Sequence, residues 1–176
     1  MAIWQFSITF LPKEPLLKEF GEIPSRLSED YWQLLDYENL EESDDPLRKF
    51  WHGHTLEFYE SIIAELSNNY PEVEWLKEYK NSYGWGNTQT DDIYLSFEEN
   101  QVTEFTGRNN LRQIDKKFIS RILKISQEKD LVLVDRNGNI FEPQWESLLS
   151  RIKESDSFRF VENPRKFIEN LGNKSL

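Results

Sequence analysis

The stretch from residue 91 to residue 142 constrains the fold most, because it combines strand and helix patterns with enough apolar residues to found a core. Apolar and polar residues alternate over 93–97, a polar turn follows at 98–100, and an extended pattern resumes over 102–112. Two such runs around a short polar turn predict a β-hairpin.

A helix and a second hairpin follow in the same stretch. Asp115 stands where a helix N-cap belongs, and the apolar residues after it recur at helical spacing, which predicts an amphipathic helix over 115–128. The run 131–134 is rich in β-branched residues, and Asn137-Gly138 separates it from the next apolar pair. Asn-Gly between apolar runs predicts a type I′ hairpin turn, whose two central residues have positive φ.

The N-terminal half gives shorter patterns. Alternating residues over 3–11 predict a first strand, and apolar residues at helical spacing predict a helix over 55–68. Short helices are expected around 27–35 and over 72–80. The rest of the region up to about residue 51 has a poor pattern and is expected to be part loop and part short helix.

Three further elements are predicted outside the central stretch. Two glycines flank Trp85, which predicts an irregular loop filled by the indole ring. Pro143 leads a helix, and Asn163-Pro164 begins a last one with an N-cap and a proline at the first helical position. Between these two helices, residues 157–161 are predicted to be extended.

A length of 176 residues suits one domain with a real core. We therefore predict a single α+β domain over 1–176, with a mixed or antiparallel sheet, helices packed on it, and an acidic excursion at about 12–51. A β-α-β-β-α-β skeleton, the ferredoxin-like arrangement, can be drawn through it, with the excursion as an N-terminal insertion and with extra C-terminal helices. The skeleton uses 3–11, 55–68, the first hairpin, 115–128 and 131–134.

The charge of the chain limits its partners. The formal net charge is −11 and the isoelectric point is about 4.7. Such a charge repels phosphate backbones and anionic membrane surfaces, so we expect neither a nucleic acid nor a membrane as the partner. A basic protein partner is favoured.

Most of this charge lies in one segment, because residues 29–45 hold eight acids and no lysine or arginine. A run of this kind speeds association with a basic protein, and its aromatic residues offer buried anchor area. A solvated acidic face is the alternative interpretation. The candidate partner-binding residues are Tyr31, Trp32, Asp36, Tyr37, Glu38, Glu41, Glu42, Asp44 and Asp45.

Few residues indicate catalysis or metal binding. The chain has no cysteine, so disulfides and thiolate metal sites are excluded. His52 and His54 are the only histidines; as alternate residues of a strand they could face one metal, but no third ligand stands at a recognisable spacing. Nucleophile-elbow and phosphate-loop motifs are absent from the sequence. We expect no catalytic residue, metal or cofactor, and we expect paired acids such as Asp91-Asp92 to be solvated turn residues.

The sequence also bears on location. The amino terminus lacks the basic and apolar regions of a signal peptide, and no run of 18 apolar residues occurs. We therefore expect a soluble, cytoplasmic protein.

Arg108, Asn110 and Arg112 alternate on one face of the predicted strand 102–112. Two interpretations stay open: the arginines hold the excursion or the C-terminal helices by internal ion pairs, or they line a shallow pocket for an anionic ligand. The second interpretation, joined to the two histidines, would describe a small-ligand or metal-dependent enzyme that uses His52, His54 and the Arg108/Arg112 face.

Three short motifs stand in the second half of the chain: Tyr83-Gly84-Trp85-Gly86-Asn87, Arg108-Asn109-Asn110-Leu111-Arg112 and Phe160-Val161-Glu162-Asn163-Pro164. With them, the region at about 83–171 resembles uncharacterised small bacterial proteins of the kind found among immunity proteins of toxin systems. The resemblance implies a cytosolic, non-enzymatic protein that binds another protein, and it transfers no catalytic residue.

Overall fold

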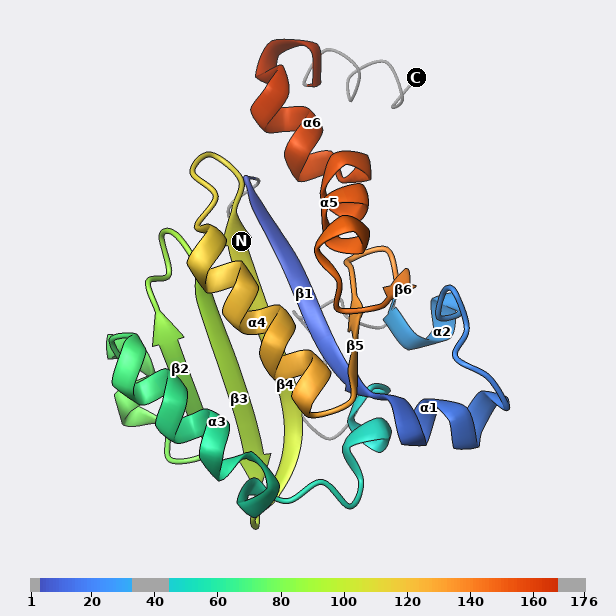
Figure 1. Cartoon of the computed structure of the whole chain (residues 1–176), viewed down its shortest axis with the longest axis vertical. Helices are drawn as coiled ribbons and strands as arrows, with labels where there is room; N and C mark the ends of the chain where they lie inside the picture. Colours follow the sequence, from blue (N-terminus) through green and yellow to red (C-terminus); the bar gives the residue numbers. More distant parts are fainter. Residues whose placement is uncertain (1–3, 33–44, 168–176) are drawn as a thin grey trace.

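A computed structural model of the chain describes residues 4–32 and 45–167 (Figure 1). Its strands are β1 (Gln5–Pro12), β2 (Ser82–Gly86), β3 (Asp92–Glu98), β4 (Gln101–Asn110), β5 (Leu131–Val134) and β6 (Ile140–Phe141). Its α-helices are α1 (Lys13–Phe20), α2 (Glu29–Trp32), α3 (Leu56–Asn69), α4 (Lys116–Glu128), α5 (Trp145–Glu154) and α6 (Asp156–Glu162). The 3₁₀-helices η2 (Arg48–Trp51) and η3 (Glu74–Glu78) are also described. None of the helices within the described ranges is long and apolar enough to cross a membrane.

The six strands form one sheet in the order β2-β3-β4-β1-β5-β6, and every neighbouring pair is antiparallel. The predicted α+β class is therefore confirmed. The β-α-β-β-α-β skeleton is present as β1, α3, β3, β4, α4 and β5, with β1 between β4 and β5. The sheet extends beyond this skeleton by one strand on each side.

The helices α3 and α4 lie side by side across one face of the sheet (Figure 1). Side chains alternate along each strand, so one set of residues meets these helices and the other set points away. Phe10 of β1 stacks on Phe105 of β4 with ring centroids 4.3 Å apart, and Tyr59 of α3 packs against Phe105. The opposite face of β3 and β4 is polar and carries Tyr94, Thr106 and Arg108.

Both edges of the sheet are covered by short segments of the same chain. Beside β2, the backbone N–H of Val73 donates to the Gly84 carbonyl at 2.9 Å. Beside β6, the N–H of Ile140 donates to the Ser25 carbonyl at 2.9 Å. Because an uncovered edge strand invites pairing with another chain, these contacts favour binding through side chains over strand addition.

The type I′ turn lies at a different position from the predicted one. Glu99 and Asn100 have φ values of 45° and 72° and connect β3 to β4. Asn137-Gly138 does connect a hairpin, β5 to β6, but only Gly138 has a positive φ there. Asp135 explains the difference, because its carboxylate accepts hydrogen bonds from the backbone N–H groups of Asn137 and Asn139 and so stabilises a longer loop.

Three other elements differ from the predictions. Residues 157–161 are helical, because the Ser155 hydroxyl accepts from the Phe158 N–H at 3.1 Å and starts α6. The region around Trp85 is strand β2, although the indole is buried as expected and donates to Ser67 Oγ at 2.9 Å. Helix α1 was not predicted, because prolines usually interrupt helices. Here they are tolerated because they precede or occupy its first turn.

Candidate functional site

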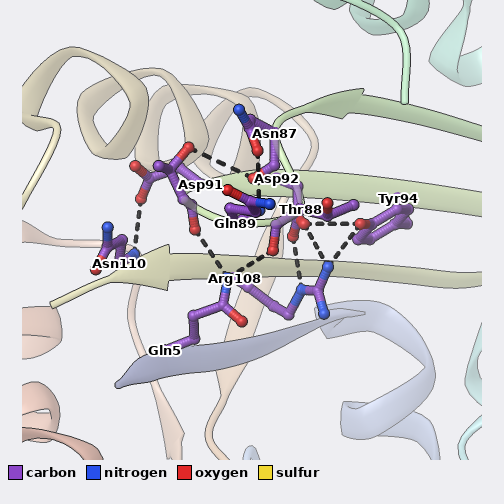
Figure 2. Close-up of polar contacts among 10 residues, drawn as sticks. Gln5, Asn87, Thr88, Gln89, Asp91, Asp92, Tyr94, Arg108 and Asn110 are labelled. Carbon is purple, nitrogen blue, oxygen red and sulfur yellow. Dashed lines mark hydrogen bonds and ion pairs between the residues drawn. The ribbon is translucent and has the colours of Figure 1, made fainter. Parts of the chain in front are cut away.

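Arg108 of the predicted arginine face belongs to a half-buried polar network between β3 and β4 (Figure 2). Arg108 Nε donates to Asp92 Oδ1 at 2.7 Å, and a second guanidinium nitrogen contacts the other carboxylate oxygen. The Tyr94 hydroxyl donates to Asp92 and accepts from Arg108, both at 2.7 Å. The Asp92 side chain has no exposed surface, and its hydrogen bond raises the pKa of Arg108. The pair therefore neutralises a charge inside the protein.

Asp91 is buried next to this pair. Its carboxylate accepts from the backbone N–H of Asn110 at 2.9 Å and from Asn109 Nδ2 at 3.3 Å. Burial raises the pKa of Asp91. The expectation that Asp91-Asp92 are solvated turn residues is therefore wrong: both acids hold strands together.

The loop before Asp91 is fixed by side chains and by one glycine. Gln5 of β1 donates through Nε2 to the carbonyls of Thr88 and Thr90 at 3.2 and 2.9 Å. Gly86 has a φ of 104°, and a Cβ there would lie 2.3 Å from the Asp91 carbonyl oxygen. Backbone and side chains thus fix the loop above the ends of β1 and β4, as Figure 2 shows.

Arg108, Asn110 and Arg112 take separate partners. Arg108 forms the internal ion pair that one interpretation expected, but with β3 instead of the excursion or the C-terminal helices. Asn110 accepts from the backbone N–H of Arg112 at 3.0 Å, and the Arg112 guanidinium lies 4.5 Å from the centre of the Trp4 ring. The three side chains do not converge on one pocket.

The two histidines lie on a turn and not on a strand. The N–H of His54 donates to the Trp51 carbonyl at 3.0 Å, and Gly53 has a φ of 87°, so the chain reverses here. His52 is exposed, whereas His54 is half-buried with Nδ1 3.2 Å from the Tyr59 hydroxyl, and burial lowers the pKa of His54. Among the described residues no group of three or more His, Cys, Asp or Glu could hold a metal ion.

Both histidines line a groove of about 840 Å³ between α1 and the start of α3. Its other charged residues are Glu14, Lys18, Glu19 and Lys49. Arg108 and Arg112 are not among its lining residues. The enzymatic interpretation needs His52, His54, Arg108 and Arg112 in one site, but the histidines lie in this groove and the arginines lie outside it.

The acidic segment is only partly described. Asp36, Tyr37, Glu38, Glu41, Glu42 and Asp44 lie outside the described residues, and Trp32 is the last residue of α2. The Tyr31 ring packs against Phe20 and Phe50, with centroids 5.8 and 5.7 Å away. Lys49 Nζ donates to the Tyr31 hydroxyl at 3.1 Å. Tyr31 is thus engaged in contacts within the protein.

Asp45 fixes the other end of this segment. Its carboxylate accepts from the Leu47 N–H at 2.8 Å, and its carbonyl accepts from the Arg48 N–H at 3.1 Å, so it forms the turn that leads into η2. Burial raises the pKa of Asp45. Because Tyr31 contacts Lys49 and Phe50 of the same 3₁₀-helix, both flanks of residues 33–44 are held at η2.

An exposed apolar surface borders these flanks. Leu17 and Phe20 stand one helical turn apart on α1 and are 46% and 37% exposed. Phe20 contacts both Tyr31 and Phe50. We call Leu17, Phe20 and Tyr31 the α1 patch. The sequence reasoning missed it because the helix that carries it was missed; the apolar triplet Leu16, Leu17 and Phe20 was the available signal.

Comparisons with protein-family models, with curated proteins and with solved structures give no match for this chain. The resemblance to immunity proteins therefore stays a prediction from the sequence. Function has to be inferred from the charge, exposure and contacts of the chain itself.

Proposed function

We propose that the protein is a non-catalytic, acidic protein-binding module, an immunity-type inhibitor that covers a basic site of a partner protein. The observation that carries the proposal is the concentration of negative charge in the acidic run. Residues 29–45 contain eight acids and no lysine or arginine. Tyr31 and Asp45, on the two sides of residues 33–44, both contact residues at or next to η2.

Fixed flanks favour binding for an entropic reason. A segment with free ends loses more conformational freedom when a partner orders it, and that loss reduces affinity. The hydrogen bonds of Lys49 to Tyr31 and Glu19, and the turn at Asp45, restrict the ends before any partner arrives. The concentrated negative charge would then raise the rate of encounter with a basic surface.

An adjacent-gene assay tests the proposal. The products of the genes next to this one are expressed one at a time in a bacterial host, with and without the protein. We expect one product to be toxic alone and harmless when co-expressed, and the two purified proteins to bind each other. If no adjacent product is both bound and neutralised, the immunity-type proposal is wrong.

A charge variant tests the role of the acidic run in the same pair. Glu38, Glu41, Glu42 and Asp44 are replaced by their amides, and Asp45 is left unchanged because its carboxylate accepts from the Leu47 N–H in the turn before η2. The association rate should fall several-fold and its salt dependence should flatten, with a smaller effect on dissociation. An unchanged association rate would make the run a solvated face.

A further inference from the structure

A buried amide oxygen at the end of β4 has no hydrogen-bond donor. Asn109 is 1% exposed, and within the described residues no N–H or O–H group donates to its Oδ1. An acceptor left unpaired in the interior destabilises the folded protein, so buried oxygens nearly always have a donor. Asn109 Oδ1 therefore points to a neighbouring group that can supply a proton.

Asp91 is the neighbour in contact with this amide. Asn109 Nδ2 donates to Asp91 Oδ1 at 3.3 Å, and the backbone N–H of Asn110 donates to the same oxygen at 2.9 Å. In the described part of the chain no hydrogen bond involves Asp91 Oδ2. A protonated carboxyl group carries one O–H donor, and a primary amide has both donors and an acceptor, so the two can pair through two hydrogen bonds. One of these bonds is present here, and the second would join Asp91 Oδ2 to Asn109 Oδ1.

The surroundings of Asp91 favour its protonated form. Burial raises the pKa of Asp91, and the negative charges of Asp115 and Asp92 raise it further, whereas the two hydrogen bonds to Oδ1 lower it. Asp92 begins β3, and Asp115 caps α4. Asp91 therefore lies between two other acids at a place where a third negative charge is unfavourable.

The basic and phenolic groups nearby leave this charge unbalanced. Arg108 is held by Asp92, and no ion pair among the described residues includes Asp91. Burial, and the charges of Asp115 and Asp91, raise the pKa of Tyr70, so its hydroxyl stays neutral near pH 7. A proton is therefore the positive charge available to Asp91.

We propose that Asp91 and Asn109 form a pH-sensitive latch, in which the protonated Asp91 carboxyl group donates from Oδ2 to Asn109 Oδ1. The latch fastens residues 87–91 to the end of β4. Gln5 holds the same loop from β1 through the carbonyls of Thr88 and Thr90. As pH rises through the pKa of Asp91, the proton passes to water and leaves two acceptor oxygens with no proton between them. The loop is then held less tightly to β4, and the free energy of unfolding falls.

Replacement of Asp91 by asparagine copies the protonated form at every pH. The introduced amide can donate to Asn109 Oδ1 as the acid does, while its oxygen still accepts from the Asn110 N–H. Asp92→Asn is the matched control, because Asp92 is the adjacent buried acid and pairs with Arg108 as a carboxylate. Thermal unfolding of the full chain is measured for both variants at pH 4 and pH 8.

Asp91→Asn should leave the unfolding temperature almost unchanged at pH 4 and raise it at pH 8, whereas Asp92→Asn should lower it at pH 8. In a chain that also carries Asn109→Leu, which removes the acceptor, the gain from Asp91→Asn at pH 8 should be largely lost. If Asp91→Asn lowers the unfolding temperature at pH 8 as the control does, the ionised carboxylate is the structural form and there is no latch. If the gain is as large with Asn109→Leu as without it, burial alone explains the gain and the inference is overturned.

Hydrogen exchange decides the matter if the chains with Asn109→Leu do not fold. In the Asp91→Asn protein, the latch predicts that the introduced side-chain amide exchanges at least about tenfold more slowly than the side-chain amide of the exposed Asn68. Exchange as fast as that of Asn68 would show that Asn109 Oδ1 accepts no proton from position 91.

Discussion

Replacing Arg108 by methionine should expose the cost of the buried charge on Asp92. The substitution keeps an unbranched apolar stem but removes the two guanidinium contacts to the carboxylate. The Asp92 side chain has no exposed surface, and only the Tyr94 hydroxyl would still donate to it. A buried carboxylate without its cation is among the most destabilising groups in a protein interior.

The magnitude follows from burial. Removing one partner of a buried ion pair costs about 3–5 kcal/mol. The Arg108 side chain is 22% exposed, so water would reach the vacated space and relieve part of this cost. The remaining Tyr94 hydrogen bond relieves a further part. We therefore expect a loss of about 3 kcal/mol, a large fraction of the 5–15 kcal/mol that stabilises a typical domain.

Urea denaturation of three proteins measures this loss: the unaltered chain, Arg108→Met, and the double variant Asp92→Asn/Arg108→Met. The double variant removes the stranded charge, so it should recover most of the loss. A loss below about 1 kcal/mol for Arg108→Met, or a double variant no more stable than the single one, would show that Asp92 is accessible to water in the folded protein.

Three further outcomes are expected. Leu148→Ala should lower the free energy of unfolding, measured by chemical denaturation, by about 2–5 kcal/mol because Leu148 is fully buried on α5. A far smaller loss would mean that this helix does not pack on the core. Asp115→Ala should cost about 1 kcal/mol by removing the cap that accepts from Lys117 and Phe118, measured against an exposed Lys→Ala control on α4. Burial raises the pKa of Asp91, so folding favours its protonated form, and the free energy of unfolding falls as pH rises through that pKa. Asp91→Asn should remove this part of the pH dependence in unfolding titrations between pH 3 and pH 7. An unaltered pH profile would contradict this expectation.

Elements defined by neighbouring residues could be predicted from the sequence. The N-cap at Asp115 and the helix after it were predicted because the cap and the apolar stripe lie within one segment, and the structure confirms both. Helix α3 spans Leu56–Asn69, within one residue of the predicted range 55–68 at each end. Residues 157–161 were mispredicted because Phe158 and Phe160 alternate as they would in a strand, and the cap that decides the matter comes from Ser155.

The candidate site was harder to predict because its contacts join distant parts of the chain. Arg108 is sixteen residues from Asp92, and its partner is set by strand register. The α1 patch meets the acidic segment where Phe20 contacts Tyr31, and both rings pack against Phe50 of η2. No local pattern in the sequence indicates that these residues are neighbours.

The register itself depends on one irregularity. Phe97 pairs with Val102, but Ser96 pairs with Glu104, so Thr103 is an extra residue in β4. Without it, the turn at Glu99 and Asn100 would place Asp92 opposite Gly107 and would turn Arg108 to the other face, because a one-residue slip inverts every side chain after it.

The spacing of apolar residues in the sequence does indicate this β-bulge, the extra residue in β4. Val102 and Phe105 are both buried in the core but stand three residues apart, and strict alternation would send one of them to the polar face. An odd spacing between two core residues in one strand requires an extra residue between them. Once that residue is placed, the cross-strand pairing brings Arg108 to the buried carboxylate of Asp92, and two acids that resemble a solvated turn become part of the interior.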